Sequence, residues 1–149
     1  MNRETVLNII SFLFALLFVY AAVSKLLDLQ KFQVELGKSP LLSFIAVPLS
    51  YAVPVLEIML SLMVFASPLR TIGLYASFSL MVMFTTYIII IMNYSYYVPC
   101  SCGGILGTLG WRSHLAFNIA FVFFGLIGIV ISESTKNDVF NLMASARKS

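Results

Sequence analysis

The chain has 149 residues, of which 60% are hydrophobic, 14% aromatic and only 10% charged. An average soluble domain is roughly 45–50% apolar and about 25% charged, and a disordered chain is more polar still, so this composition excludes both classes. The net charge of +3 comes from scattered basic residues, whereas a nucleic-acid surface needs clustered Lys and Arg, so we expect no nucleic-acid partner.

Four runs of the chain are apolar and long enough to span a bilayer, which takes about 20 residues per helix. They cover about 6–25, 44–66, 71–92 and 114–131. The first run resembles a signal peptide, but its apolar stretch of about 18 residues exceeds the usual 7–15, so we interpret it as an uncleaved helix. The sequence therefore predicts an all-α fold: one integral membrane domain over 1–149, built as a four-helix bundle in a lipid bilayer.

A polar segment, Asp28 to Ser43, separates the first two runs. Its apolar side chains, Phe32 and Leu36 among them, recur at roughly helical spacing between charged ones. This pattern predicts a short amphipathic helix in the membrane interface, with a solvated loop as the alternative. In the second run we expect Pro54 to kink the helix by freeing the carbonyl of Ser50.

The third and fourth runs are joined by a loop over 93–113, which holds both cysteines, and a polar tail covers 132–149. Four spans place both termini on one side of the membrane, and basic residues favour the cytoplasmic side. The terminal side carries Arg3, Arg70, Lys136, Arg147 and Lys148, and the other side Lys25, Lys31, Lys38 and Arg112. We therefore expect a bacterial inner-membrane protein with cytoplasmic termini and a periplasmic cysteine loop, where thiol pairs can stay oxidised.

Cys100 and Cys102 are the only cysteines, and one residue separates them in a glycine-rich stretch. The two α carbons can approach to about 5.5–6 Å, which permits a disulfide. So small a ring is strained, and strained disulfides are the labile, oxidising ones, which favours a catalytic dithiol/disulfide pair. A structural disulfide is one alternative. A Cu or Zn site completed by His114 is another, although no fourth ligand is evident.

His114 opens the fourth run beside Trp111 and Arg112, and all three lie close in sequence to the cysteines. A cationic neighbour would raise the thiolate fraction of a cysteine. Asn118 lies one helical turn after His114 on the same face. We interpret these four as supporting residues of a thiol site, with interfacial anchoring and an ordinary interhelical hydrogen bond as the alternatives.

Glu57 lies near the middle of the second run, where a carboxylate costs at least about 2.5–3.5 kcal/mol unless it faces the bundle interior with a partner. We expect it to be protonated or paired with Lys25, across an axial gap of about 8 Å that a long side chain would have to close. Four further polar residues of the spans could line the same interior: Tyr51, Thr85, Thr86 and Tyr87. The pair would either fix the helix register or relay protons.

Taken together, these motifs resemble the DoxX/MauE superfamily. The stretch Ala-Ala-Val-Ser-Lys-Leu-Leu-Asp at 21–28 and the stretch Pro-Val-Leu-Glu-Ile at 54–58 carry the resemblance. The loop Val-Pro-Cys-Ser-Cys-Gly-Gly, followed by Trp-Arg-Ser-His-Leu at 111–115, resembles the redox-associated MauE branch. The resemblance covers about 5–132, and by position it implies that Lys25, Glu57, Cys100 and Cys102 are the family's polar and thiol residues.

The resemblance implies a four-helix membrane bundle with a role in periplasmic disulfide maturation beside a thioredoxin-like partner, and DoxX relatives are linked to quinone-coupled sulfur oxidation. The MauE loop reads Cys-Gly-Cys-Phe-Gly, whereas this chain has Cys-Ser-Cys-Gly-Gly, so the redox potential, the partner and a methylamine-specific substrate are not carried over.

Two hypotheses about function follow. In the first, Cys100 and Cys102 exchange electrons with a periplasmic thioredoxin-like or client protein, as a thiol–disulfide oxidoreductase coupled to a quinone held near Trp111, His114 and Glu57. In the second, the chain is a non-enzymatic subunit that anchors or scaffolds a larger membrane complex, and the cysteine pair is a structural disulfide.

Overall fold

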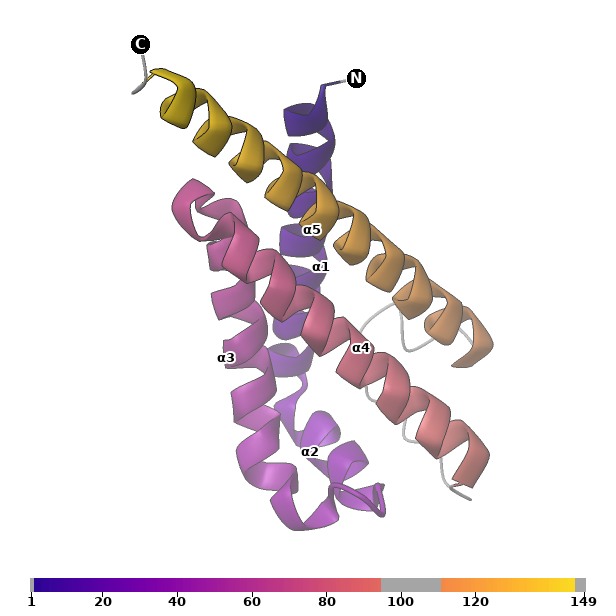
Figure 1. The fold of residues 1–149 in the computed structure, drawn as a ribbon. Helices are drawn as coiled ribbons and strands as arrows, with labels where there is room; N and C mark the ends of the chain where they lie inside the picture. The colour runs from indigo at the N-terminus through magenta and orange to yellow at the C-terminus, as the bar shows by residue number, and fades with distance from the viewer. Residues whose placement is uncertain (1, 95–110, 147–149) are drawn as a thin grey trace.

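The computed structural model describes residues 2–94 and 111–146, and these residues form helices joined by short turns (Figure 1). The elements are α1 (Arg3–Leu27), α2 (Leu29–Lys38), η1 (Ser43–Ile45), α3 (Ala46–Phe65), η2 (Ser67–Leu69), α4 (Arg70–Tyr94) and α5 (Trp111–Ala146). Four segments are long and apolar enough to cross a membrane: Arg3–Leu27, Ser43–Phe65, Ser67–Tyr94 and Arg112–Thr135. The predicted all-α class with four membrane helices is therefore confirmed.

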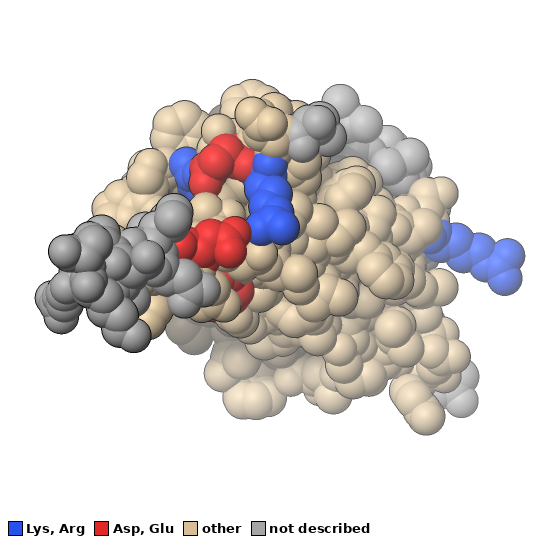
Figure 2. All heavy atoms as spheres, turned by 45° about the horizontal axis from the view of Figure 1, so that its top comes forward, with Lys and Arg blue, Asp and Glu red and all other residues tan. Residues whose placement is uncertain are grey.

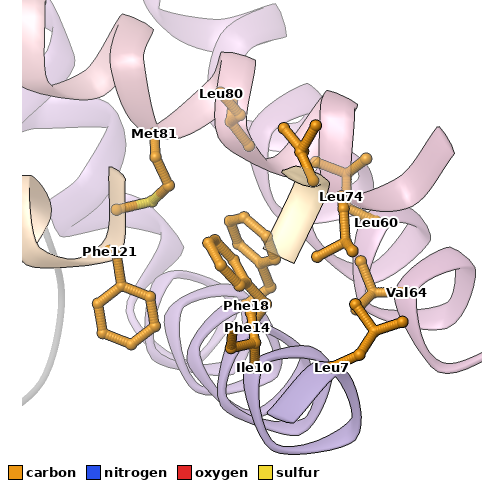
Figure 3. Packing of buried hydrophobic residues seen from close by; sticks show 11 residues of the cluster. Leu7, Ile10, Phe14, Phe18, Leu60, Val64, Leu74, Leu80, Met81 and Phe121 are labelled. Atoms are coloured by element: carbon orange, nitrogen blue, oxygen red, sulfur yellow. The ribbon is translucent and has the colours of Figure 1, made fainter. Parts of the chain in front are cut away.

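The four long helices form a ring around an apolar core. α1 packs chiefly against α3 and α4 chiefly against α5, while contacts of α3 with α4 and of α1 with α5 close the ring. Figure 3 shows Phe14 and Phe18 of α1 at the centre of this core, beside Leu60, Leu74 and other buried side chains. The opposite faces of the helices expose large apolar side chains, as expected of surfaces that contact lipid.

α2 is a short amphipathic helix that packs on α3 at the end of the bundle away from the termini (Figure 1). It begins where the Asp28 carboxylate accepts a hydrogen bond from the backbone N–H of Lys31, at 3.3 Å. Phe32 and Leu36 are buried and form a second apolar cluster with Ala46. The amphipathic prediction for this segment is thus confirmed, and the helix covers part of the bundle.

One long helix continues through the proline at which we expect a kink, and another continues past the predicted end of its span. α3 runs through Pro54, which is fully buried. α5 begins three residues before the predicted fourth span and continues through Ala146, so most of the polar tail is helical. The chain contains no Gly or Pro after Gly128, so leaving the apolar region does not by itself break the helix.

Polar contacts tie both α5 and α4 to α1 at the end of the bundle that carries both termini. The Arg3 guanidinium contacts Asp138 Oδ2 and Ser134 Oγ, each at 2.9 Å, and Arg70 donates to Asn8 Oδ1 at 2.9 Å. Figure 2 looks toward this end and shows acidic and basic side chains side by side, with another basic side chain that projects at the right edge of the view. The two contacts of Arg3 hold the polar part of α5 close to the start of α1.

The exposed Arg3–Asp138 pair should contribute little to stability. Its side chains are 62% and 64% exposed, and ion pairs of this kind are worth about 0.2–1 kcal/mol. We expect Asp138→Asn to lower the free energy of unfolding by less than about 1 kcal/mol, and the difference to shrink as salt is raised. Reversible unfolding in detergent at low and high salt measures this. A salt-independent loss of more than about 2 kcal/mol would contradict the assignment of Arg3–Asp138 as a weak surface pair.

Candidate functional site

A buried ion pair joins the end of α1 to the middle of α3. Lys25 Nζ lies 2.7 Å from Glu57 Oε1, and the two side chains are only 7% and 1% exposed. Lys25 Nζ also donates to the carbonyl of Ala21, at 3.4 Å, one turn earlier in α1. Because helical side chains lean toward the N-terminus, the lysine reaches back along its own helix and closes the predicted axial gap.

The surroundings of the pair are apolar, with one aromatic ring beside the cation. Lys25 Nζ lies 5.9 Å from the centroid of the Phe32 ring of α2, within the range of a cation–π contact. A single charge at this depth would cost several kcal/mol, so the two opposite charges stabilise each other where neither would be tolerated alone. Glu57 Oε1 is satisfied by the lysine, whereas Oε2 is buried and has no hydrogen-bond partner among the described residues.

The ion pair lines a cavity of about 270 Å³ that lies between the helices. Each of the five α-helices contributes to its wall, and most of the wall is apolar. The polar or charged side chains in the wall are Lys25, Glu57, Tyr87, His114 and Asn118, and the aromatic rings include Phe32, Phe84 and Phe117. The cavity is therefore a lipophilic chamber with a small polar group of residues on its wall.

α2 closes one side of this cavity. Phe32 and Leu36 of α2 are part of the wall. Tyr87 of α4 donates a hydrogen bond from its hydroxyl to Ser39 Oγ, at 3.0 Å, and Ser39 is the buried C-cap of α2. The sequence singled out neither Ser39 nor this covering role of α2. The only available signal was the apolar face of the amphipathic segment.

The structure gathers four of the eight predicted site residues at one place. Lys25, Glu57, His114 and Asn118 all line the cavity, and His114 and Asn118 are 5% and 6% exposed. Arg112 is exposed at the start of α5 and is not part of the wall. Tyr51, which we expected to line the interior, is 52% exposed.

The predicted thiol pair lies outside the described residues, as does the side chain of Trp111. Cys100 and Cys102 belong to the connection between α4 and α5, and in sequence Cys102 precedes the cavity residue His114 by twelve positions. Within residues 2–94 and 111–146 no three His, Cys, Asp or Glu side chains come together as a metal site would require.

The fold and the buried pair define a class: a multi-pass helical membrane protein with a charged pair on the wall of an internal apolar cavity. A family model described as methylamine utilisation protein MauE matches residues 3–131, so the chain belongs to the MauE family. The predicted resemblance to MauE is thus confirmed, and placement in the wider DoxX/MauE superfamily stays a prediction. No curated protein and no solved structure matches the chain.

Proposed function

We propose that this chain is a bacterial inner-membrane thiol–disulfide protein that uses Cys100 and Cys102 to exchange electrons with a periplasmic thioredoxin-like or client protein. The observation that carries the proposal is where the cysteines fall in the chain. Both occur in the connection between α4 and α5, and these helices contribute Tyr87, His114 and Asn118 to the cavity wall. Membership of the MauE family supports a membrane-associated role, and the family's description links it to methylamine utilisation.

The proposed exchange is a two-electron reaction. A thiolate of the partner attacks one sulfur of the Cys100–Cys102 disulfide, which breaks the S–S bond and forms a mixed disulfide. The partner's second thiolate then attacks this bond, so the partner leaves as a disulfide and the two cysteines are left as thiols. The partner loses two electrons and the cysteine pair gains them. Return of the pair to the disulfide needs an acceptor in the membrane, and a quinone, which takes two electrons and two protons, has this chemistry.

Trapping of mixed disulfides tests the proposal. Because the exchange is reversible, the single thiolate left in Cys100→Ala or Cys102→Ala can attack the disulfide of the oxidised partner, whose second sulfur leaves as a thiolate. Without a neighbouring cysteine to resolve it, we expect the mixed disulfide to accumulate in one of the two variants and dithiothreitol to release it. The double Cys→Ala variant is the control and should form none. A redox potential of the wild-type pair above about −230 mV would agree with exchange, because structural disulfides usually lie below about −300 mV.

The scaffold hypothesis is distinguished by the same measurements. If neither single variant forms an adduct and the pair is always oxidised and hard to reduce, the disulfide is a structural staple of the loop. A double Cys→Ser variant that supports growth and assembly normally would lead to the same conclusion and would overturn the exchange proposal.

A further inference from the structure

The internal cavity has three features that together describe a ligand. Its wall is mostly apolar, it contains several aromatic rings, and it includes a buried carboxylate of which one oxygen has no hydrogen-bond partner among the described residues. Buried polar atoms are nearly always hydrogen-bonded, and an exception calls for an explanation such as a missing binding partner. Glu57 is 1% exposed, so bulk water does not satisfy Oε2.

The hydrogen-bonding pattern fixes what the head group must be. Glu57 Oε2 can only accept, so the ligand must donate, which a hydroxyl does and a quinone or ester carbonyl does not. Among residues 2–94 and 111–146, Lys25 Nζ donates to Glu57 Oε1 and to the carbonyl of Ala21, and its third N–H group can donate to a ligand oxygen. A hydroxyl oxygen is both a donor and an acceptor and matches this arrangement with a single atom.

The charge and the aromatic rings of the wall indicate the charge and the body of the ligand. Lys25 and Glu57 neutralise each other, so a charged ligand would bring an uncompensated charge into an apolar chamber. The rings of Phe32, Phe84 and Phe117 favour an aromatic body, because stacked or edge-to-face aromatic pairs are stabilised beyond the area that they bury. We propose that the cavity binds an uncharged lipophilic phenol, with its hydroxyl on Glu57 Oε2 and its ring among these phenylalanines.

Hydroquinones are the redox-active members of this ligand class. The inference rests on the proposed function only for that redox role, because binding of a phenol needs neither cysteine. If the ligand is a hydroquinone, the cavity holds the reduced form of the electron acceptor. The hydroxyl of the hydroquinone donates a hydrogen bond to Glu57 Oε2, whereas the oxidised quinone has only carbonyl oxygens and cannot donate one.

Matched probes test the head group. We would titrate the detergent-solubilised full chain with 4-pentylphenol and with its methyl ether, 4-pentylanisole, and measure binding by calorimetry. We expect saturable phenol binding, with the ether weaker by about tenfold or more, because a hydrogen bond to a charged group is lost. In the Lys25→Met/Glu57→Leu variant this preference should disappear. Equal binding of the two probes to the wild type would overturn the proposal.

Matched variants test the location. Val53 of α3 lines the cavity, whereas Val55 on the same helix is 56% exposed and faces outward. Val53→Phe should abolish saturable phenol binding, and Val55→Phe should leave it unchanged. Should Val53→Phe fail to fold, a diazirine-bearing alkylphenol on the wild type gives the same information: we expect labelled peptides from α2 and α4, and labelling of outward-facing residues alone would overturn the proposal.

Two further outcomes separate the alternatives. Decanol that binds as tightly as 4-pentylphenol would overturn the aromatic part of the proposal, and decylhydroquinone binding in competition with 4-pentylphenol would support the redox member of the class. Phenol binding without any mixed disulfide would leave the cavity site standing and remove the proposed thiol exchange. Mixed disulfides without phenol binding would do the opposite.

Discussion

Separate replacement of Lys25 by Met or of Glu57 by Gln is expected to lower the free energy of unfolding by about 3–5 kcal/mol. Each change removes one member of a pair whose side chains are 7% and 1% exposed. The remaining charge is then buried without a counter-charge, and this uncompensated charge accounts for most of the cost. Reversible unfolding in mixed detergent micelles, followed by the helical circular dichroism signal, measures the effect.

The double variant Lys25→Met/Glu57→Leu provides the decisive comparison. Apolar replacement of a whole buried ion pair is often neutral or stabilising, so we expect the double variant to be more stable than either single one. Lys38→Met is the matched control, because Lys38 is 48% exposed in its pair with Glu35, and it should cost less than about 1 kcal/mol. The single variant Glu57→Leu closes the cycle: if the effects of Lys25→Met and Glu57→Leu simply add to that of the double variant within about 0.5 kcal/mol, the pair does not couple the helices.

Gly73→Val should also be strongly destabilising, because α3 and α4 approach each other closely at this glycine. A Cβ atom built on Gly73 would lie 2.8 Å from the backbone nitrogen of Val64 and 3.0 Å from the backbone carbon of Met63. The short η2 turn holds the two helices together nearby, so the backbones cannot separate freely. We expect Gly73→Ala to cost about 1–3 kcal/mol, as overpacking does, and Gly73→Val to cost more.

Gly37→Ala is the control for this prediction. Gly37 lies in α2, and apart from its chain neighbours and its own helix backbone no atom of the described residues lies within 4 Å of a Cβ built there. Since Ala is favoured over Gly in a helix by about 0.5–1 kcal/mol, this change should be neutral or slightly stabilising. Thermal unfolding of the two alanine variants side by side gives the comparison. If Gly73→Ala were as stable as Gly37→Ala, the close approach of α3 and α4 would not limit packing.

The candidate site could be predicted only in part, because the signals in the sequence concern single residues or neighbours within one helix. Glu57 is conspicuous in sequence because a carboxylate in an apolar run is costly, and Lys25 is a basic residue at the end of another run. His114 and Asn118 share a face because they are four residues apart in a helix. The prediction that Tyr51 lines the interior was wrong, and Arg112 is exposed as well, so the sequence alone did not tell which polar residues near or within a span face outward.

The amino-acid sequence by itself determined the class of this protein, the number of membrane helices and the amphipathic nature of the segment after the first one. These properties follow from the bilayer as the solvent of the chain. Backbone groups in lipid must be hydrogen-bonded within a helix, and a sufficient length of apolar residues places that helix in the bilayer. Hydropathy is local along the chain, so these properties can be read without knowing the neighbours.

Only the tertiary structure decided which helix faces meet. It placed Lys25 against Glu57, brought α2 over the cavity through the Tyr87–Ser39 hydrogen bond, and continued α5 through Ala146 beside Arg3. Residues far apart in sequence make these contacts, and between membrane helices the choice depends on close packing and polar pairing rather than on hydrophobicity. The outer faces are as apolar as the inner ones, so the sequence pattern does not distinguish the face toward lipid from the face toward the cavity.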